Sequence, residues 1–528
     1  MRKVKNMGNG FCFSFVTMAV AGLVSTGLAV DRLWIGTDGG EWNAAANWNP
    51  EGVPTKSDTA IFRSDGTRVV RLSAMPSGIG GLRFERGTTI LQTMLANVTG
   101  SSNGGSPLAM PTGTNVFYAA AGAMGVLSNV FNGCAGAVIR KDGLGEIVVA
   151  MPLGTGYGYF EALDIREGTV STCSDISPQY GLVSDVRIRA GAVLRTARAS
   201  SLHPNFAVCV DAGGVWDWGA ANQTFAAITG SGDLVDFPSG YNLTEDVAAK
   251  LDGFVGRLVL PPTRNMSFTP SSVRTLSFAV ETEAADDASA GTVKAGWGLF
   301  KNTQTLTLER LQGDGAFSFA GPTAVSRAET TGALFWLNAG AEVSVAGGTA
   351  LLAGDQLKFR AGSRLRVENG AFVGRAPAVP AYGGWTRAKR PAGVSVIDGP
   401  EHGAIEVVSG GTFFSAAGLG AKTVTVASGG TFALGRSSVV MSGTSAGDPA
   451  RLTVDGGTLS LRTEVSPYAI DVTARRRRCC AARRRARRSS APAGRPRLRC
   501  GLTRSGPFAS RLPSSPRGGC PTRNSKTS

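Results

Sequence analysis

A short unit recurs toward the C-terminal side of the chain: an alternating strand, a Gly-Gly turn and a second alternating strand. It occurs at 405–413, 424–432 and 452–459, and apolar residues alternate with polar ones as in half-buried strands. The glycines suit a corner that needs positive φ, which side chains penalise. One such unit cannot bury its apolar face alone, so copies must stack on one another. The repeat therefore restricts the chain to folds built from stacked β coils.

Further copies of this unit extend the pattern toward the N-terminus. Weaker versions lie at 186–194, 343–352 and 365–373. Gly-x-Gly steps that begin at Gly143, Gly230 and Gly313 are spaced almost evenly and suggest a larger period of several coils. The sequence predicts an all-β fold, specifically a right-handed parallel β-helix (β-solenoid). A β-sandwich is less favoured, because its hairpins use Asn-Gly loops and less regular spacing.

Stacking also predicts which side chains face the core. The residues expected to point inward are Val424, Val426, Phe432 and Leu434, and those expected to point outward are Thr425, Thr431 and Ala433. The outer face of these coils would then carry little charge.

The net charge of +16 comes from one end of the chain. Residues 475–528 hold 17 of the 54 Lys and Arg residues and no Asp or Glu. The preceding 474 residues therefore carry 37 basic against 38 acidic side chains. We expect no nucleic-acid partner for this body of the protein, since its charges balance.

The N-terminus has the three parts of a secretory signal. Arg2, Lys3 and Lys5 form a cationic start, 11–24 is mostly apolar, and small residues precede an expected cleavage after Ala29. An uncleaved anchor is the alternative, since the apolar stretch reaches about 20 residues, the minimum for a membrane span. No later segment is long and apolar enough to span a membrane as a helix. From the signal pattern we expect export, with the protein secreted or on the outer surface of the cell envelope.

The end of the chain has a different character from its body. Residues 475–528 contain no Val, Ile, Tyr or Trp, so they supply neither strands nor a core. The Arg-, Pro- and Ala-rich composition indicates an out-of-frame reading of a GC-rich gene, and a genuine basic tail that binds polyanions is the alternative.

These observations predict four parts. They are a signal peptide at 1–29, a Trp-rich N-terminal cap at 30–64, solenoid repeats at 65–474 that become irregular around 241–295, and an Arg-rich disordered tail at 475–528.

Two stretches resemble a known family. Lys141-Asp142-Gly143-Leu144-Gly145, followed by 162–170, is similar to the autotransporter-associated β-strand repeat of exported bacterial β-helix proteins. Trp34, Trp42, Asn47-Trp48 and Phe62 resemble the opening module of large exported β-helix proteins that often end in a sorting tail. The resemblance implies a passenger-like or surface protein and names no activity.

Candidate chemistry is sparse. Only His203 and His402 offer imidazole, so we predict no catalytic residue, metal site or cofactor. Trp34, Trp42 and Trp48 could contact glycans, but capping of the first open coil is the stronger interpretation. An enzyme would need paired carboxylates on adjacent coils, for which the candidates are Asp175, Asp185, Asp211 and Asp217.

The sequence as a whole indicates an exported cell-surface or secreted solenoid with a structural or adhesive role. Its expected partners are glycans or other components of the cell envelope. A β-helix polysaccharide lyase or glycoside hydrolase is the alternative, since a fold alone does not establish a function.

Overall fold

The structure is a computed structural model. It describes residues 29–73, 78–93, 109–128, 132–133, 136–150, 161–172, 184–197, 206–287, 289, 292–376, 403–415, 421, 423–434 and 451–461. The chain divides into two units, Met1–Arg475 and Arg476–Ser528, and all described residues belong to the first. The described residues do not include 1–28 of the predicted signal at 1–29, the tail at 475–528, Asp175 or either histidine. In the ranges given above, no helix is long and apolar enough to cross a membrane.

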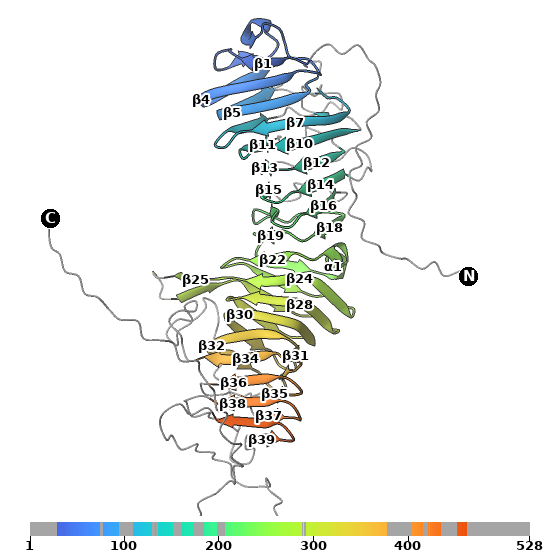
Figure 1. The fold of residues 1–528 in the computed structure, drawn as a ribbon, viewed down its shortest axis with the longest axis vertical. Coiled ribbons are helices and arrows are strands. Elements are labelled where there is room, and N and C mark those ends of the chain that lie inside the picture. The colour runs from blue at the N-terminus through green and yellow to red at the C-terminus, as the bar shows by residue number, and fades with distance from the viewer. Residues whose placement is uncertain are drawn as a thin grey trace, which may run out of the picture. The chain divides into compact units, whose positions relative to one another are not determined.

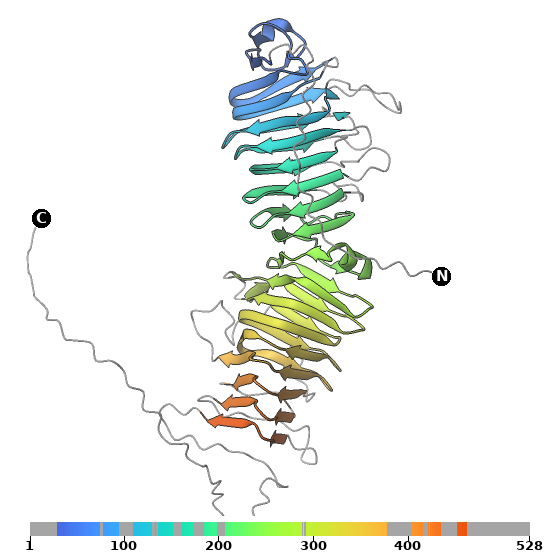
Figure 2. The same ribbon diagram turned by 45° about the vertical axis from the view of Figure 1, so that its right-hand side comes forward.

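The described residues confirm an all-β parallel solenoid. One sheet of 36 strands holds almost all of the described strands, and successive coils lie side by side in chain order (Figures 1 and 2). Each strand pairs in parallel with the strand one coil later, as in β10–β12, β12–β14 and β14–β16. Three series of parallel pairs run along the solenoid, and we call each series of hydrogen-bonded strands a ladder.

The first ladder runs through most of the described coils. It comprises β7 (Gly113–Ala119), β10 (Ala137–Asp142), β12 (Ala162–Ile165), β14 (Ser184–Ile188), β16 (Phe206–Val210), β18 (Ala227–Gly230), β21 (Gly253–Phe254), β31 (Glu342–Val345), β33 (Arg364–Val367), β35 (Ala404–Val407), β37 (Thr423–Val426) and β39 (Arg451–Val454). The first parts of the long strands β4 (Thr59–Leu72), β5 (Gly81–Thr93), β24 (Arg274–Thr282), β28 (Leu306–Gly313) and β30 (Thr323–Leu337) also belong to it.

The second ladder follows the first around one corner. It comprises β8 (Met124–Ser128), β11 (Glu146–Ala150), β13 (Gly168–Thr172), β15 (Ala192–Thr196), β17 (Val215–Asp217), β19 (Asp233–Val235), β22 (Arg257–Leu260), β32 (Gly348–Phe359), β34 (Phe372–Ala376), β36 (Thr412–Ser415), β38 (Thr431–Leu434) and β40 (Thr458–Leu461). The later parts of β4, β5, β24 and β28 and the middle of β30 complete it.

The third ladder is described chiefly in the middle of the solenoid. It comprises β20 (Tyr241–Leu243), β23 (Asn265–Phe268), β27 (Trp297–Phe300), β29 (Ala316–Phe319) and the last residues of β30 and β32. Two short strands, β6 (Ala109–Met110) and β9 (Asn132–Gly133), form a separate parallel pair nearer the N-terminus.

The Gly-Gly turns lie at the corner between the first and second ladders. Gly429 has a φ of 77°, in the left-handed region that glycine tolerates best. A Cβ on the next residue, Gly430, would lie 2.4 Å from the carbonyl oxygen of Val407 in the preceding coil. The first glycine therefore allows the turn, and the second allows the coils to stack closely.

One of the three Gly-x-Gly steps lies at a different corner from the other two. Gly143 directly follows β10 and Gly230 ends β18, both in the first ladder, whereas Gly313 ends β28 and leads into β29 of the third ladder. The near-equal spacing in the sequence therefore does not mark a repeat of structurally equivalent coils, because coil lengths vary.

A continuous apolar core fills the solenoid. Val424, Val426 and Phe432 are buried, as predicted, whereas Thr425 and Thr431 are half-buried and Ala433 is also buried. In the third ladder, the inward rings of Phe268, Phe300 and Phe319 stack from coil to coil, with centroids 4.7 and 5.2 Å apart. Alternate residues thus form columns whose burial stabilises the coils at about 25 cal/mol per Å² of apolar surface.

The region predicted to be irregular, 241–295, retains the coils. The helix α1 (Glu245–Lys250) follows β20, and the ladders continue through β22, β23 and β24. The insertion is confined to an antiparallel hairpin of β25 (Ala284–Asp287) and β26 (Thr292–Ala295). Repeats fade in the sequence here because the connecting segments differ, while the strand positions are kept.

Candidate functional site

The three N-terminal tryptophans form the core of the cap. Trp34 lies in β1 (Asp31–Trp34), Trp42 follows β2 (Gly40–Glu41), and Trp48 begins β3 (Trp48–Asn49) after the 3-10 turn at Ala45–Asn47. They are only 3%, 0% and 1% exposed. Trp48 meets the other two edge to face, with centroids 5.0 and 4.8 Å apart.

This tryptophan cluster covers the first coil. All three rings pack on Phe62 of β4, and Phe62 stacks on Phe84 of β5 with centroids 5.2 Å apart. Their ring faces therefore offer no stacking surface to a sugar, and their burial favours the capping interpretation. The first coil begins at Thr59, inside the segment expected to be cap.

The three described candidate carboxylates are spread over two ladders, and two of them are paired with arginine. Asp211 pairs with Arg187 at 3.1 Å, and Asp217 pairs with Arg195 at 2.9 Å in the second ladder. Asp185 lies on β14 of the first ladder. The pKa of Asp185 is raised because protein partly desolvates it and because Glu161 adds negative charge.

A charged network lies on the outer face of the first ladder. Strand register places Arg140, Asp164, Arg187 and Cys209 in one outward column. A second column holds Asp142, Arg166, Arg189 and Asp211, which stand two residues further along each coil. We call these two columns the paired face.

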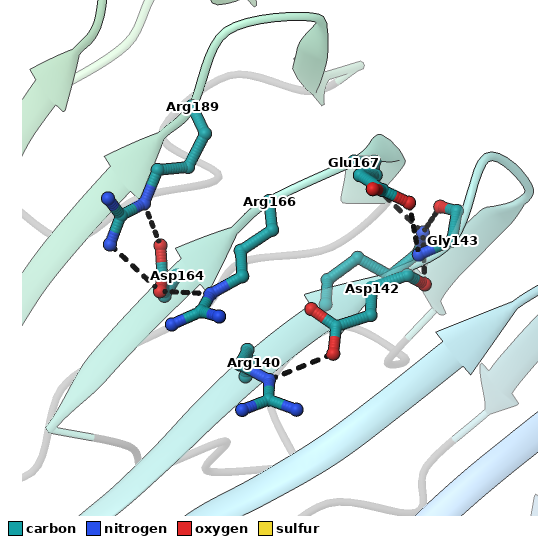
Figure 3. A network of polar contacts seen from close by, with 8 residues as sticks. Arg140, Asp142, Gly143, Asp164, Arg166, Glu167 and Arg189 are labelled. Atoms are coloured by element: carbon teal, nitrogen blue, oxygen red, sulfur yellow. Dashed lines mark hydrogen bonds and ion pairs between the residues drawn. The ribbon is translucent and has the colours of Figure 1, made fainter.

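Asp164 is the centre of the paired face. Its carboxylate accepts hydrogen bonds from Arg189 Nε at 2.7 Å, Arg189 Nη2 at 3.1 Å and Arg166 Nε at 3.0 Å (Figure 3). Burial opposes ionisation of Asp164, but these hydrogen bonds outweigh it and hold its pKa below the ordinary value. With Arg140–Asp142 and Arg187–Asp211, each Asp of the two columns is paired with arginine, so the face joins neighbouring coils.

Lys141 occupies an inward position that is otherwise apolar. Its register partners are Phe117 and Ile165, and it is 1% exposed. Its Nζ donates to the carbonyl oxygens of Asp142, Gly143 and Glu167 at 3.1, 2.6 and 3.0 Å. Burial lowers the pKa of Lys141 to about 8, although nearby carboxylates oppose this. The amine therefore holds the corner of the coil and is withdrawn from solvent.

A different surface lies on the outer face of the third ladder. One outward column is Leu299, Ser318, Trp336 and Lys358. Trp297 stands beside Leu299, and its ring centroid lies 6.5 Å from that of Trp336. The small residues Ala316 and Ser318 occupy the intervening coil, and both indoles remain half-buried. We call this surface, with its flanking residues Lys301, Asn338 and Arg360, the open face.

No cation of the open face has a carboxylate partner in the described part of the chain. The Arg360 guanidinium lies 5.5 Å from the Trp336 ring centroid, and its Nε is buried without a hydrogen-bond acceptor among the described residues. Within those same residues, Lys301, Lys358 and Arg360 form no ion pair. Asn338 donates to Ser318 Oγ at 3.0 Å, and Ser318 is the register partner of Trp336, so the open face also carries an amide and a hydroxyl group.

The hairpin β25–β26 borders the open face. Val293 and Ala295 of the hairpin form a small apolar cluster with Ala316 and Leu334 of the third ladder, and Trp297 packs against it. The hairpin thus supports one edge of the aromatic pair.

The sequence interpretation missed the open face. Trp336 lies in the continuous apolar run 333–337, where period alone does not reveal the outward position. The cations of the open face lie on other coils than Trp336, so only the strand register brings them close to it. In the described part of the chain, no group of three or more His, Cys, Asp or Glu side chains could hold a metal ion.

Comparison with protein-family models, curated proteins and solved structures finds no match to this chain.

Proposed function

We propose that this chain is an exported β-solenoid with a structural or adhesive role at the cell surface. The tripartite N-terminal sequence supports export. A filled apolar core and a repetitive outer surface suit a protein that acts through an extended face. The sequence resemblance to autotransporter-associated repeats is consistent with the same role.

The open face is the observation that carries this proposal. It combines two half-buried indoles with cations that have no carboxylate partner among the described residues. Aromatic rings and unpaired cations on one surface are typical of binding sites. The paired face, in contrast, satisfies its own charges.

Export is tested in the organism that encodes the chain. Intact cells are treated with protease, and the solenoid is followed with an antibody raised against the purified protein. We expect digestion without cell lysis and a mature N-terminus at Val30. A matched variant with Arg2, Lys3 and Lys5 changed to Glu should remain inside. Protection of the wild-type chain until lysis, with Met1 retained, would overturn the proposal.

A β-helix glycosidase or lyase is the second candidate, and one observation favours it. Asp185 has a raised pKa beside Glu161, and a general acid needs such an environment. Incubation with acidic and neutral polysaccharides, followed by a reducing-end assay, tests this alternative. Product release that Asp185→Asn abolishes would favour the enzyme, and binding without product release would favour the adhesive role.

A further inference from the structure

We propose that the open face binds an anionic polysaccharide, with Trp336 and Trp297 against the sugar rings and Lys301, Lys358 and Arg360 against its acidic groups. The inference rests on the proposed export, because it takes an extracellular polyanion as the ligand. It assigns a ligand class to a surface that lies far in sequence from the predicted tryptophans.

The charge of the surface is the first argument. The outward positions Leu299, Lys301, Ser318, Trp336, Asn338, Lys358 and Arg360 include three cations and no Asp or Glu. The body of the chain is close to neutral, and the arginines of the paired face are matched by aspartates. These outward positions therefore carry positive charge with no acidic residue among them, and this charge complements an anion.

The guanidinium of Arg360 is the second argument. It forms no ion pair among the described residues, and because its Nε is buried, the terminal Nη groups are the donors left for a ligand. The guanidinium is held near the Trp336 ring. A carboxylate or sulfate oxygen of a ligand could accept from this group, because guanidinium binds such anions in a bidentate manner.

The arrangement of the aromatic rings is the third argument. The two indoles come from coils on either side of the small residues Ala316 and Ser318, and their planes are inclined by 58°. Indole offers an apolar face and a polar edge. Ser318 and Asn338 add a hydroxyl and an amide beside the rings, which are suitable partners for sugar hydroxyls. A glycan uses all of these groups at once.

The test measures protection of individual lysines in the full-length protein. The protein is acylated with and without polygalacturonate or dextran sulfate, and labelling of each lysine is read by peptide mass spectrometry. This readout separates the open face from the basic residues of 475–528. We expect protection of Lys301 and Lys358, and no protection by neutral dextran.

Variants determine whether the aromatic and basic residues act together. Trp336→Ala and Lys358→Glu should each weaken the binding that protects Lys301 by about tenfold, equivalent to about 1.4 kcal/mol. Arg140→Ala is the matched control on the paired face and should leave protection unchanged. Thermal unfolding checks that each variant folds, and Lys358→Glu tests the surface even if Trp336→Ala does not fold.

Three outcomes would overturn the inference. They are absence of protection by both anionic polysaccharides, equal protection by neutral dextran, and equal protection by single-stranded DNA of matched charge, which would indicate unselective attraction of polyanions. Failure of export is distinguishable, since a chain retained inside cells could still show glycan-dependent protection in vitro.

Discussion

The paired face and the open face use the same scaffold in opposite ways. On the paired face, Asp164 pairs with Arg166 of its own coil and with Arg189 of the next coil, so the second ion pair connects successive coils. On the open face, the cations Lys358 and Arg360 lie near Trp336 and form no ion pair with a carboxylate of the described residues. Both sets occupy outward positions of parallel ladders, so the difference arises from the residues placed there.

This contrast distinguishes outward residues that stabilise the solenoid from outward residues that are available to bind a ligand. A charge that is satisfied by its neighbour stabilises the coil and has little left for a ligand, whereas an uncompensated charge adds to the potential that a ligand meets. We therefore expect substitutions on the two faces to affect different measurements.

The largest predicted effect concerns Lys141, whose side chain points inward from the strand that carries Arg140 and Asp142 of the paired face. The pKa of buried Lys141 is lowered to about 8, against about 10.4 in the unfolded chain. Between these values the unfolded state binds more protons, so the free energy of unfolding rises with pH, by on the order of 3 kcal/mol. Lys141→Met should lose this rise in urea titrations between pH 7 and about 10.

The wild type serves as the reference for that slope. Burial raises the pKa of Tyr241 to about 12, so its ionisation reduces stability only above about pH 10. Equal slopes for the wild type and Lys141→Met below pH 10 would show that the amine is not buried as described.

A smaller effect on the free energy of unfolding is expected when one residue of each face is replaced by alanine. Asp164→Ala should lower the free energy of unfolding by about 2 kcal/mol at pH 7, because it removes hydrogen bonds to a charged group. Lys358→Ala, on the open face, should change it by less than about 0.5 kcal/mol. Chemical denaturation of both variants measures the difference. Equal losses would contradict the distinction between the faces.

The same Asp164 variant has a defined pH dependence. The folded-state pKa of Asp164 lies below its ordinary value, so its contribution is present above the unfolded pKa of about 3.9. The contribution is lost as pH falls through the folded-state pKa. The stability difference between wild type and Asp164→Ala should therefore be constant from pH 7 to 5 and shrink in acid.

The smallest effect concerns an exposed pair of the paired face. Arg140 lies 2.9 Å from Asp142, and both side chains are partly exposed. Such pairs contribute about 0–1 kcal/mol and are weakened by salt. Arg140→Ala should therefore cost less than Asp164→Ala, and its cost should fall further in about 1 M salt. A cost that exceeds that of Asp164→Ala would indicate a different centre for the network.

Strand alternation predicted much of the solenoid. Val424 and Val426 point inward as expected because a strand has period two and one face is buried. The Gly-Gly corners were predictable for the same local reasons. Their prediction needed only the residues of one coil.

The third ladder and the open face depend on long-range register. Phe268, Phe300 and Phe319 stack although they are far apart in sequence. Their alignment is not visible in the sequence because the connections between coils differ in length. Trp336 also lies in an uninterrupted apolar run. The same variability explains why Gly313 is at a different corner from Gly143. The burial of the three N-terminal tryptophans, in contrast, favours the capping interpretation that the sequence suggested.

Strand register in the third ladder is the basis of the open face, and paired cysteines test it most directly. In a background with the eight native cysteines changed to Ser, Leu299→Cys and Ser318→Cys should form a disulfide, because these register partners lie on adjacent strands about 4.8 Å apart. The control pair, Leu299→Cys with Asn338→Cys, is separated by an extra coil and should not. We expect the first pair to oxidise with unchanged thermal stability. Failure of that pair to oxidise, or preferential oxidation of the control pair, would contradict the register of the third ladder.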